Sequence, residues 1–522
     1  MIILGLGGLI NDPACTILKD GKLTAAVEQK KIARYYQAGE LPGEAIAMAL
    51  QLSGVTADSV DSVALVRPFA TGPESALHLA LRARFPKSQL VLVEHHAAHA
   101  ASAYFSSPFE EATVLTLDRI GDFRCGARWQ ARGNELDLER ELYYPDSLGD
   151  LYGRVTELLG FRANADEHKV QWLSTAGDDA FEPLFEEILG VDSNGWPRFD
   201  RSYFDADRLS HGGFSPKFYR RLQLEDGEPV PEAMHAQIAA GLQRAIEATV
   251  LRMAGHAHNL CLAGGLGFNA LLVSALEQSC NVFVQPMAGN AGTSLGGALY
   301  AWHTIYKQAQ RAGLEDLCLG PSYSPEDIKL VLENCKLRFR YLNTIDELVD
   351  SAVRDINDQK IIAWMQGRME FGPRALGNRS ILASPLNPYS TENLNVFIKH
   401  REPFRKFAAS VPAELQAEYF EVGPNSRYLA TVGRVKPAYR QTFQSAILGA
   451  DLVRVHTVSR QDNPLYHRLL HAAGESTGLP VLYNTSFNLF GDPLVCTPRD
   501  AVRSFYSSGI DALFVGNFVL EK

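Results

Sequence analysis

A short run of histidines gives the clearest metal-binding pattern in the sequence. In EHHAAH (residues 94–99), His95 and His99 are four residues apart, and Asp118 follows at the end of a later apolar run. Residues at i and i+4 share one face of a helix, so both imidazoles could reach one ion. Imidazole together with a carboxylate suits Fe(II) or Zn. The alternative is a helix N-terminus at which the histidines only form hydrogen bonds.

Two glycine-rich turns could hold a phosphate group. Gly264 and Gly265, with Asn269 after them, follow one predicted strand, and Gly292 lies in a similar turn after the next. Backbone N–H groups at such strand-to-helix turns can bind phosphates. The two turns therefore indicate a nucleotide or acyl-nucleotide site, although glycine also allows a strand and a helix to pack closely. The sequence contains no GxxxxGK[ST], which excludes a P-loop protein.

Basic side chains concentrate between residues 367 and 406. The segment GPRALGNRS (372–380) carries Arg374 and Arg379, and KHREPFRK (399–406) carries Lys399, Arg401 and Arg405. One guanidinium group can donate two parallel hydrogen bonds to phosphate oxygens, and a lysine adds a point charge. Converging cations of this kind could hold two anionic phosphates against each other. The alternative is a solvated basic rim, or one that pairs with an acidic first domain.

Short amides and hydroxyls follow the apolar run PVLY near the C-terminus. The segment is NTSFN, from Asn484 through Ser486 to Asn488. Such side chains at a strand end could orient a small planar polar group. They could equally form a turn that caps the next element, and spacing alone does not decide between the two.

The elements that must position these residues form a repeated pattern. Three β-rich runs in the first 30 residues, with a hairpin signal at Asp20-Gly21, resemble three further runs over residues 111–145. Each set has an aspartate just after its first strand, at Asp12 and at Asp118. A duplicated meander of this kind predicts an α/β, actin-like fold of the sugar kinase and heat-shock ATPase type. The composition changes near residue 340, so we expect domains at 1–340 and 341–522.

Composition limits the class of protein. The 522 residues are 46% hydrophobic and 21% charged with a net charge of −10, which is typical of a globular protein and argues against a nucleic-acid or membrane-surface binder. Seven dispersed cysteines without a CxxC pair indicate reduced thiols, and no apolar run reaches the length of a membrane span. The N-terminal run is interpreted as a first strand and not as a signal peptide. We therefore expect a cytoplasmic enzyme.

Four strings together resemble one family of enzymes. EHHAAHAASAYF (94–105), FGPRALGNRSILA (371–383), KHREPFRKFAASV (399–411) and PVLYNTSFN (480–488) are similar to motifs of the NodU/CmcH family of ATP-dependent carbamoyltransferases. The resemblance runs over nearly the whole chain. It implies an actin-like N-terminal domain and a YrdC-like C-terminal domain.

The resemblance also implies a division of labour between the domains. The C-terminal domain would make carbamoyl-adenylate from carbamoyl phosphate and ATP, with Mg as a cofactor. The N-terminal domain would then transfer the carbamoyl group, beside Fe(II) or another divalent metal, to a hydroxyl of a small-molecule acceptor such as an antibiotic or a sugar. No nucleic-acid or membrane partner is implied, and the chain could form a homodimer.

Family roles can be assigned residue by residue. The carbamoyl phosphate and ATP contacts would be Arg374, Asn378, Arg379, Ser380, Lys399, Arg401, Arg405, Asn484, Ser486 and Asn488. Carbamoyl-adenylate would lie against Gly264, Gly265, Asn269 and Gly292. The metal ligands would be His95, His99, Asp118 and Asn290, and the catalytic residues Asn11, Asp12 and Lys169.

The first domain departs from the family pattern in ways that leave alternatives open. Asn11-Asp12 replaces His-Asp, and Asn290 replaces the last expected aspartate ligand. An amide oxygen can coordinate a metal, but it is neutral and binds more weakly than a carboxylate. The sequence therefore also allows an adenylating enzyme with an amine or carrier-bound acceptor, or a degenerate subunit that binds a partner. It does not identify the acceptor.

Overall fold

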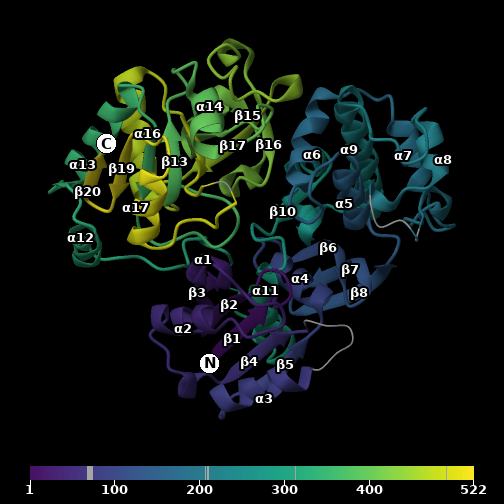
Figure 1. Ribbon diagram of the computed structural model, residues 1–522. Coiled ribbons are helices and arrows are strands. Elements are labelled where there is room, and N and C mark those ends of the chain that lie inside the picture. The colour runs from purple at the N-terminus through teal and green to yellow at the C-terminus, as the bar shows by residue number, and fades with distance from the viewer. Residues whose placement is uncertain (68–73, 206, 208–210, 312, 490) are drawn as a thin grey trace.

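The computed structural model describes residues 1–522 except 68–73, 206, 208–210, 312 and 490 (Figure 1). Its strands form three sheets of five, five and ten strands. The strands of the first two sheets come from residues 2–284, and those of the third from residues 340–521. The chain is thus a mixed α/β protein. The domain boundary at residue 340 stays a prediction.

The first two sheets repeat one topology. The first has the order β3-β2-β1-β4-β5, from β1 (Ile2–Gly7), β2 (Ala14–Lys19), β3 (Lys22–Glu28), β4 (Ser62–Val66) and β5 (Gln89–Val93). The second has the order β8-β7-β6-β9-β10, from β6 (Glu111–Gly121), β7 (Arg124–Arg132), β8 (Glu135–Tyr143), β9 (Asn259–Ala263) and β10 (Asn281–Val284). In both, an antiparallel meander is followed by two strands parallel to its first strand. The duplication predicted from the sequence is therefore present, and the order is consistent with an actin-like N-terminal part.

The turn of the first hairpin has the backbone conformation predicted from Asp20-Gly21. Asp20 and Gly21 both have positive φ, at 49° and 77°, as a two-residue turn of the predicted kind requires.

Two helices lie between the repeated sheets. They are α4 (His95–Tyr104), after the last strand of the first repeat, and α11 (Gly292–Tyr300), after the last strand of the second. Strand residues alternate between faces, so Ile3 of β1 and Val114 of β6 share one apolar core with both helices, while Leu4 and Leu115 face separate outer cores. The two helices touch closely, because a Cβ on Gly296 would overlap the carbonyl oxygen of Ala98. The two repeats are therefore joined through this helix pair.

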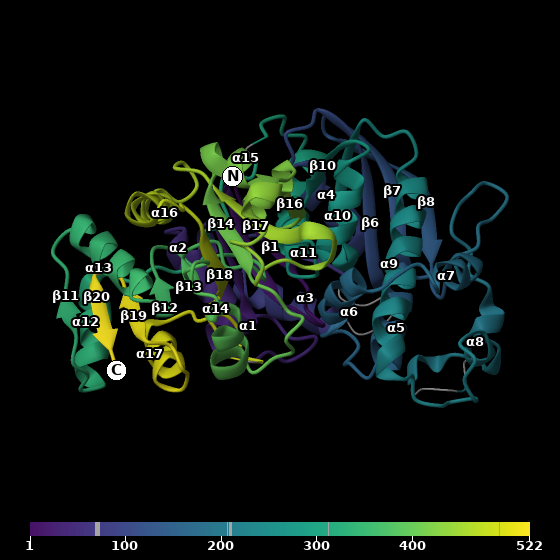
Figure 2. The ribbon, with the colours of Figure 1, turned by 90° about the horizontal axis from the view of Figure 1, so that it is seen from above.

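Other helices cover the outer faces of the two repeats. On the first repeat these include α1 (Gln29–Ala33), α2 (Gly43–Leu52) and α3 (Glu74–Arg84). On the second they include α5 (Leu148–Leu158), α6 (Glu167–Leu173), α7 (Glu182–Ile188), α8 (Pro216–Arg221), α9 (Glu232–Ala254) and α10 (Ala270–Glu277), with η5 (Gly265–Phe268) before α10. Figure 2 shows this second group at the opposite end of the molecule from the C-terminus.

The third sheet has helices on both faces. Its order is β11-β20-β19-β12-β13-β18-β14-β17-β16-β15. The strands are β11 (Arg340–Tyr341), β12 (Ile362–Met365), β13 (Arg379–Ala383), β14 (Ala408–Pro412), β15 (Phe420–Glu421), β16 (Val432–Val435), β17 (Leu452–Val458), β18 (Leu482–Ser486), β19 (Ala512–Val515) and β20 (Phe518–Glu521). Apolar residues of α12 (Pro325–Asn334) and α17 (Pro498–Tyr506) share a core with one face, and those of α13 (Ile345–Asn357) and α16 (Pro464–Thr477) with the other.

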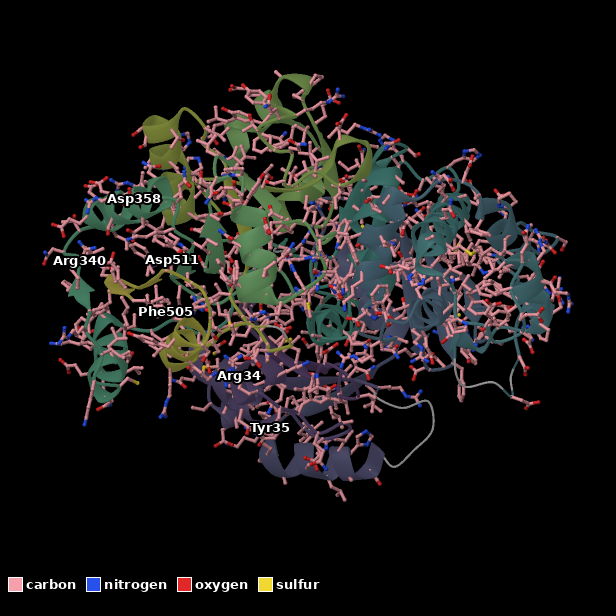
Figure 3. The ribbon with its side chains drawn as sticks, turned by 45° about the horizontal axis from the view of Figure 1, so that its top comes forward. Arg34, Tyr35, Arg340, Asp358, Phe505 and Asp511 are labelled. Carbon is pink, nitrogen blue, oxygen red and sulfur yellow. The ribbon has the colours of Figure 1, made fainter. Side chains whose placement is uncertain are left out.

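The first repeat contacts the third-sheet part directly. Arg34, just after α1, donates hydrogen bonds to the carbonyl oxygens of Pro493 (3.0 Å) and Leu494 (2.8 Å) and pairs with Asp500 at 2.7 Å. Figure 3 shows Arg34 at the junction between these two parts of the molecule. The loop that follows β18 is thereby held against the N-terminal part.

Candidate active site

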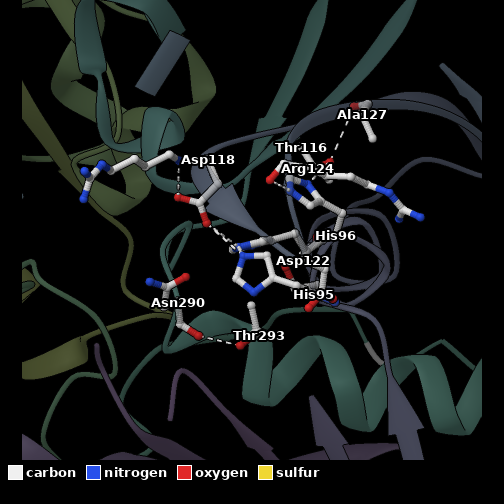
Figure 4. A network of polar contacts seen from close by, with 12 residues as sticks. His95, His96, Thr116, Asp118, Asp122, Arg124, Ala127, Asn290 and Thr293 are labelled. Carbon is white, nitrogen blue, oxygen red and sulfur yellow. Dashed lines mark hydrogen bonds and ion pairs between the residues drawn. The ribbon is translucent and has the colours of Figure 1, made fainter. Parts of the chain in front are cut away.

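His95, His99 and Asp118 converge with their ligand atoms within 4.8 Å of one another. Figure 4 shows His95 beside Asp118. His95 and His99 lie one turn apart on α4, and Asp118 lies in β6. The Nε2 atoms of His95 and His99 lie 2.9 and 3.2 Å from Oδ2 of Asp118, and 3.1 Å from each other. The other carboxylate oxygen accepts a hydrogen bond from the backbone N–H of Arg119 at 2.8 Å. The structure thus brings together three of the predicted ligands with their donor atoms converging.

Hydrogen bonds from the two histidines keep the Asp118 carboxylate ionised. Burial alone would raise the pKa of Asp118, but hydrogen bonds from His95 and His99 hold that pKa well below its usual value. Burial lowers the pKa of His99. The third histidine of the run, His96, turns away and places Nδ1 2.9 Å from the hydroxyl oxygen of Thr116. The site is therefore an anionic carboxylate beside two imidazoles, and His96 is not part of it.

Asn290 approaches from the second repeat. It lies just before α11, as His95 lies at the start of α4, so the two repeats contribute residues from equivalent places. Its backbone carbonyl accepts a hydrogen bond from the Thr293 hydroxyl at 2.5 Å, and its side-chain Oδ1 is buried without a hydrogen-bond partner. Figure 4 shows the Asn290 amide beside the imidazole and carboxylate group. Two imidazole nitrogens, one carboxylate and an unpaired buried amide oxygen fit a divalent metal ion.

The loop after β1 faces the third-sheet part across a cavity. Asp12 lines a cavity of ≈ 200 Å³ between the first repeat and the third-sheet part, whereas Asn11 is exposed and does not line it. Burial, and then the charge of Glu28, raise the pKa of Asp12. On the opposite wall the cavity is lined by Ser486 and Asn488.

The two glycine-rich turns predicted to bind phosphate have different neighbours in the structure. Gly265 lies beside the metal group, since a Cβ there would be 3.1 Å from Oδ1 of Asp118. Gly264 has φ of +92°, and a Cβ on it would overlap the Leu117 backbone, so only glycine fits there. Gly292 packs in the same way against the Met287 carbonyl. Asn269 is buried and caps α10 by accepting a hydrogen bond from the backbone N–H of Leu272 at 3.0 Å.

A second group, which we call the cationic cluster, lies in the third-sheet part and faces the second repeat. It consists of Arg374, Lys399, Arg401, Arg405 and Arg454. Burial, and then the neighbouring charge of Arg405, lower the pKa of Arg374 to about 10 and that of Arg401 to about 9. Burial and then Arg401 lower the pKa of Lys399 well below its usual value. Among the described residues, no carboxylate forms an ion pair with Arg374, Arg401 or Arg454. Such unpaired cations are stabilised by a bound polyanion.

Arg454 was not predicted from the sequence. It lies in β17, and its pKa is lowered well below the usual value by burial and then by Arg374, Arg401 and Arg405. Its guanidinium carbon lies 5.3 Å from the centre of the Trp172 ring of α6. In the sequence, Arg454 is a single arginine inside the apolar strand LVRVHTV. Its spacing does not distinguish it from an arginine on the exposed face of a strand.

Helix α6 brings further residues to the cationic cluster. Lys169 is buried, and its Nζ lies 2.8 Å from Oε1 of Glu402, which connects the second repeat to the loop that carries Arg401 and Arg405. Burial, followed by the charges of Arg405 and Arg374, lowers the pKa of His168 to about 3, so this imidazole is neutral. Arg374 also donates to the Phe268 carbonyl oxygen at 3.4 Å, at the end of η5. The cluster is thus enclosed by residues from both parts of the chain.

Lys399 connects the cationic cluster to the NTSFN segment. Its Nζ donates to Oδ1 and to the carbonyl oxygen of Asn488, at 2.8 and 2.9 Å, and to the carbonyl oxygen of Ser486 at 2.5 Å. The Ser486 hydroxyl donates to Asn488 Oδ1 at 2.7 Å. Asn484 donates to the Ala375 carbonyl oxygen at 3.0 Å, and its own Oδ1 is buried without a partner. The segment therefore leaves an amide oxygen available near the loop that carries Arg374.

Three predicted contacts lie apart from the cationic cluster. The fully buried Arg379 donates hydrogen bonds to the carbonyl oxygens of Gln366, Gly367, Asn378 and Pro321. Asn378 donates to the Arg368 carbonyl at 2.7 Å, and the Ser380 hydroxyl accepts from the Gly377 N–H at 3.1 Å. These side chains hold the 366–380 loop in shape, and the structure does not bring them together with Arg374.

The chain belongs to the carbamoyltransferase family. Residues 74–299 match the model of the carbamoyltransferase N-terminus, and residues 353–522 match that of the carbamoyltransferase C-terminus. An uncharacterised protein of Synechocystis is 31% identical over 100% of this chain and 96% of its own length. Nodulation protein NolNO of Sinorhizobium fredii is 31% identical over 98% of this chain and 79% of its own length. The 3'-hydroxymethylcephem-O-carbamoyltransferase of Amycolatopsis lactamdurans is 31% identical over 49% of this chain and 48% of its own length.

The resemblance stated from the sequence motifs is confirmed by these matches. Within the part of the chain that the structure describes, no helix is both long enough and apolar enough to cross a bilayer.

Proposed function

We propose that this protein is an ATP-dependent carbamoyltransferase that works in two steps. A YrdC-like C-terminal domain makes carbamoyl-adenylate from carbamoyl phosphate and ATP, and an actin-like N-terminal domain transfers the carbamoyl group to a hydroxyl of a small-molecule acceptor. The observation that carries the proposal is the cationic cluster, which lies against α6 and η5 and in which Arg374, Arg401 and Arg454 form no ion pair with a described carboxylate.

The first step uses the cluster to hold phosphates. Carbamoyl phosphate and ATP together give carbamoyl-adenylate, pyrophosphate and inorganic phosphate, so one water is consumed. The water releases phosphate and leaves carbamate, whose oxygen attacks the α-phosphorus of ATP and expels pyrophosphate. Both substrates are polyanions that repel each other. Arg374, Arg401, Arg405 and Arg454 offset that repulsion and stabilise the charge that develops on the leaving pyrophosphate.

The carbamoyl group needs polar partners of another kind. Its amide presents donors and an acceptor in one plane. The unpaired Oδ1 of Asn484 can accept from the carbamoyl N–H₂. Lys399 directs its three N–H donors to Ser486 and Asn488 and so fixes the segment beside Asn484. The cavity beside Ser486 and Asn488 reaches Asp12 of the first repeat, which supports passage of the adenylate from one domain to the other.

The second step takes place beside His95, His99 and Asp118. These residues, with Asn290 as a neutral fourth ligand, would hold a divalent ion, which would supply Lewis-acid stabilisation of the negative charge that develops during transfer. Asp12, whose pKa is raised by burial and then by the charges of Glu28 and Asp118, can accept the proton of the acceptor hydroxyl as that oxygen attacks the carbamoyl carbon. AMP then leaves. Enclosure between two parts of the chain limits hydrolysis of the intermediate.

The two steps can be tested separately. Purified protein should release pyrophosphate from ATP only when carbamoyl phosphate is present, and without any acceptor. Mass spectrometry with a panel of hydroxyl and amine acceptors should then find a carbamate ester. Absence of carbamoyl-phosphate-dependent pyrophosphate release from metal-loaded protein would refute the first step. Pyrophosphate release with a carbamoylated amine, or with no acceptor product, would refute transfer to a hydroxyl.

A further inference from the structure

A second group of two histidines and a carboxylate lies in the third-sheet part, on the surface of α16. His467 and His471 are one turn apart on this helix, and Glu414 lies in η8 (Ala413–Leu415), directly after β14. The Nε2 atoms of His467 and His471 lie 2.8 and 2.7 Å from the same oxygen, Oε1 of Glu414. The centres of the two imidazole rings are 4.5 Å apart. Three ligand atoms from two separate elements thus converge on one point.

This geometry is close to that of a zinc site. Ligand atoms around a tetrahedral zinc ion with bonds of about 2.0–2.1 Å lie about 3.4 Å apart. The two histidine-to-Glu414 distances therefore need to open by about 0.6–0.7 Å, which a rotation of the half-exposed Glu414 side chain can provide. The side chain of His467 is 12% exposed and that of His471 37% exposed, so an ion can enter from solvent and keep a water ligand.

We infer that His467, His471 and Glu414 bind a zinc ion that is separate from the metal of the transfer site. Two imidazoles and one carboxylate form a donor set suited to Zn, with water in the fourth position. The inference does not depend on the proposed function, because none of these residues belongs to the cationic cluster or to the His95 group.

The ion would join two elements that support the cationic cluster. Helix α16 begins beside the 372–380 loop, where Asn463 donates to Asn378 Oδ1 at 2.9 Å and to the Leu376 carbonyl oxygen at 3.3 Å. A Cβ on Gly377 of that loop would overlap the Tyr466 ring of α16. Strand β14 follows the segment that carries Arg401 and Arg405. A zinc bridge between α16 and η8 would therefore fix the relative position of the two basic segments.

The test uses the full chain with the transfer-site ligands removed. In a His95→Ala, His99→Ala double variant stripped with a chelator, ZnCl₂ should bind with one ion per chain and raise the midpoint of thermal unfolding. Co²⁺ in the same protein should give the intense visible absorption of a tetrahedral site. Adding His471→Gln or Glu414→Gln should weaken zinc binding by at least about tenfold and abolish the cobalt bands.

A matched histidine provides the control. His256 is exposed, follows α9 and belongs to neither described histidine–carboxylate group. His256→Gln in the same background should leave zinc affinity unchanged. Equal zinc affinity in the His471→Gln and His256→Gln proteins, or no stoichiometric zinc in the double variant, would overturn the inference and leave the three residues as a hydrogen-bonded surface group.

Discussion

Replacing Arg374 with glutamine should lower activity without lowering stability. The arginine lies in the cationic cluster without a carboxylate partner, and its one described hydrogen bond is a long one to the Phe268 carbonyl oxygen. Glutamine keeps part of the aliphatic stem and removes the charge. A charge-assisted contact to phosphate contributes about 2–3 kcal/mol, so pyrophosphate release should fall about 30- to 150-fold.

The stability of substrate-free Arg374→Gln should stay the same or increase, although its activity falls. Burial and Arg405 lower the pKa of Arg374 from 12.5 to about 10. That difference corresponds to about 3 kcal/mol of unfavourable free energy for keeping the side chain charged in the folded protein at neutral pH. Lost packing offsets part of the gain. We expect an unfolding midpoint that is unchanged or higher than that of the wild type.

Arg379→Gln is the matched comparison. This arginine comes from the same loop, but its removal leaves buried carbonyl oxygens of Gln366, Gly367 and Pro321 without their donor. At about 1–3 kcal/mol for each unsatisfied group, the variant should be strongly destabilised. Urea unfolding and a coupled pyrophosphate assay with saturating ATP measure both quantities. The reasoning would be refuted if Arg374→Gln kept wild-type pyrophosphate release, or if it unfolded as readily as Arg379→Gln.

Four further variants test other parts of the structure. His99→Ala should remove bound metal and carbamoyl transfer but spare pyrophosphate release, and Asn290→Asp should slow metal loss to a chelator; elemental analysis showing unchanged metal in His99→Ala would contradict this. Burial lowers the pKa of Lys399, so the unfolded chain binds the lysine proton more tightly than the folded protein does. The stability of the wild type should therefore rise as pH increases toward the usual lysine pKa of 10.5. Thermal unfolding of Lys399→Met should show a flatter rise with pH, and a pH profile identical to that of the wild type would contradict this expectation. Gly296→Ala should cost about 1–3 kcal/mol in urea unfolding, because its Cβ meets the Ala98 carbonyl oxygen, whereas a neutral effect would mean that the helix pair can relax.

The sequence was most informative where residue type and backbone position are linked. The repeated meander could be predicted because Asp20-Gly21 specifies its turn and because alternating apolar runs specify strands. His95 and His99 could be paired because helical spacing places them on one face. The aspartate expected just after the first strand of each repeat pointed to Asp118, which the structure places inside β6. Each of these inferences needs only local geometry.

The cationic site was harder, because identical side chains have different surroundings. Arg374 and Arg379 lie five residues apart, yet Arg374 faces the cationic cluster and Arg379, the first residue of β13, is enclosed by carbonyl oxygens. Arg454 joins the cluster from a distant strand through a crossover that no local pattern encodes. The Glu414 group could not be predicted for the same reason. The spacing of His467 and His471 is visible in the sequence, but their carboxylate partner lies more than fifty residues earlier.

The close contact of α4 and α11 sets the distance between the residues that the two repeats offer to a metal ion. Gly296 allows the helices to touch backbone to backbone, and each helix follows the last strand of a different repeat. His95 and His99 lie on α4, and Asn290 lies just before α11. A larger residue at position 296 would push the helices apart and so move Asn290 away from the two histidines. The size of one side chain outside the metal group therefore sets how closely its ligands can surround an ion.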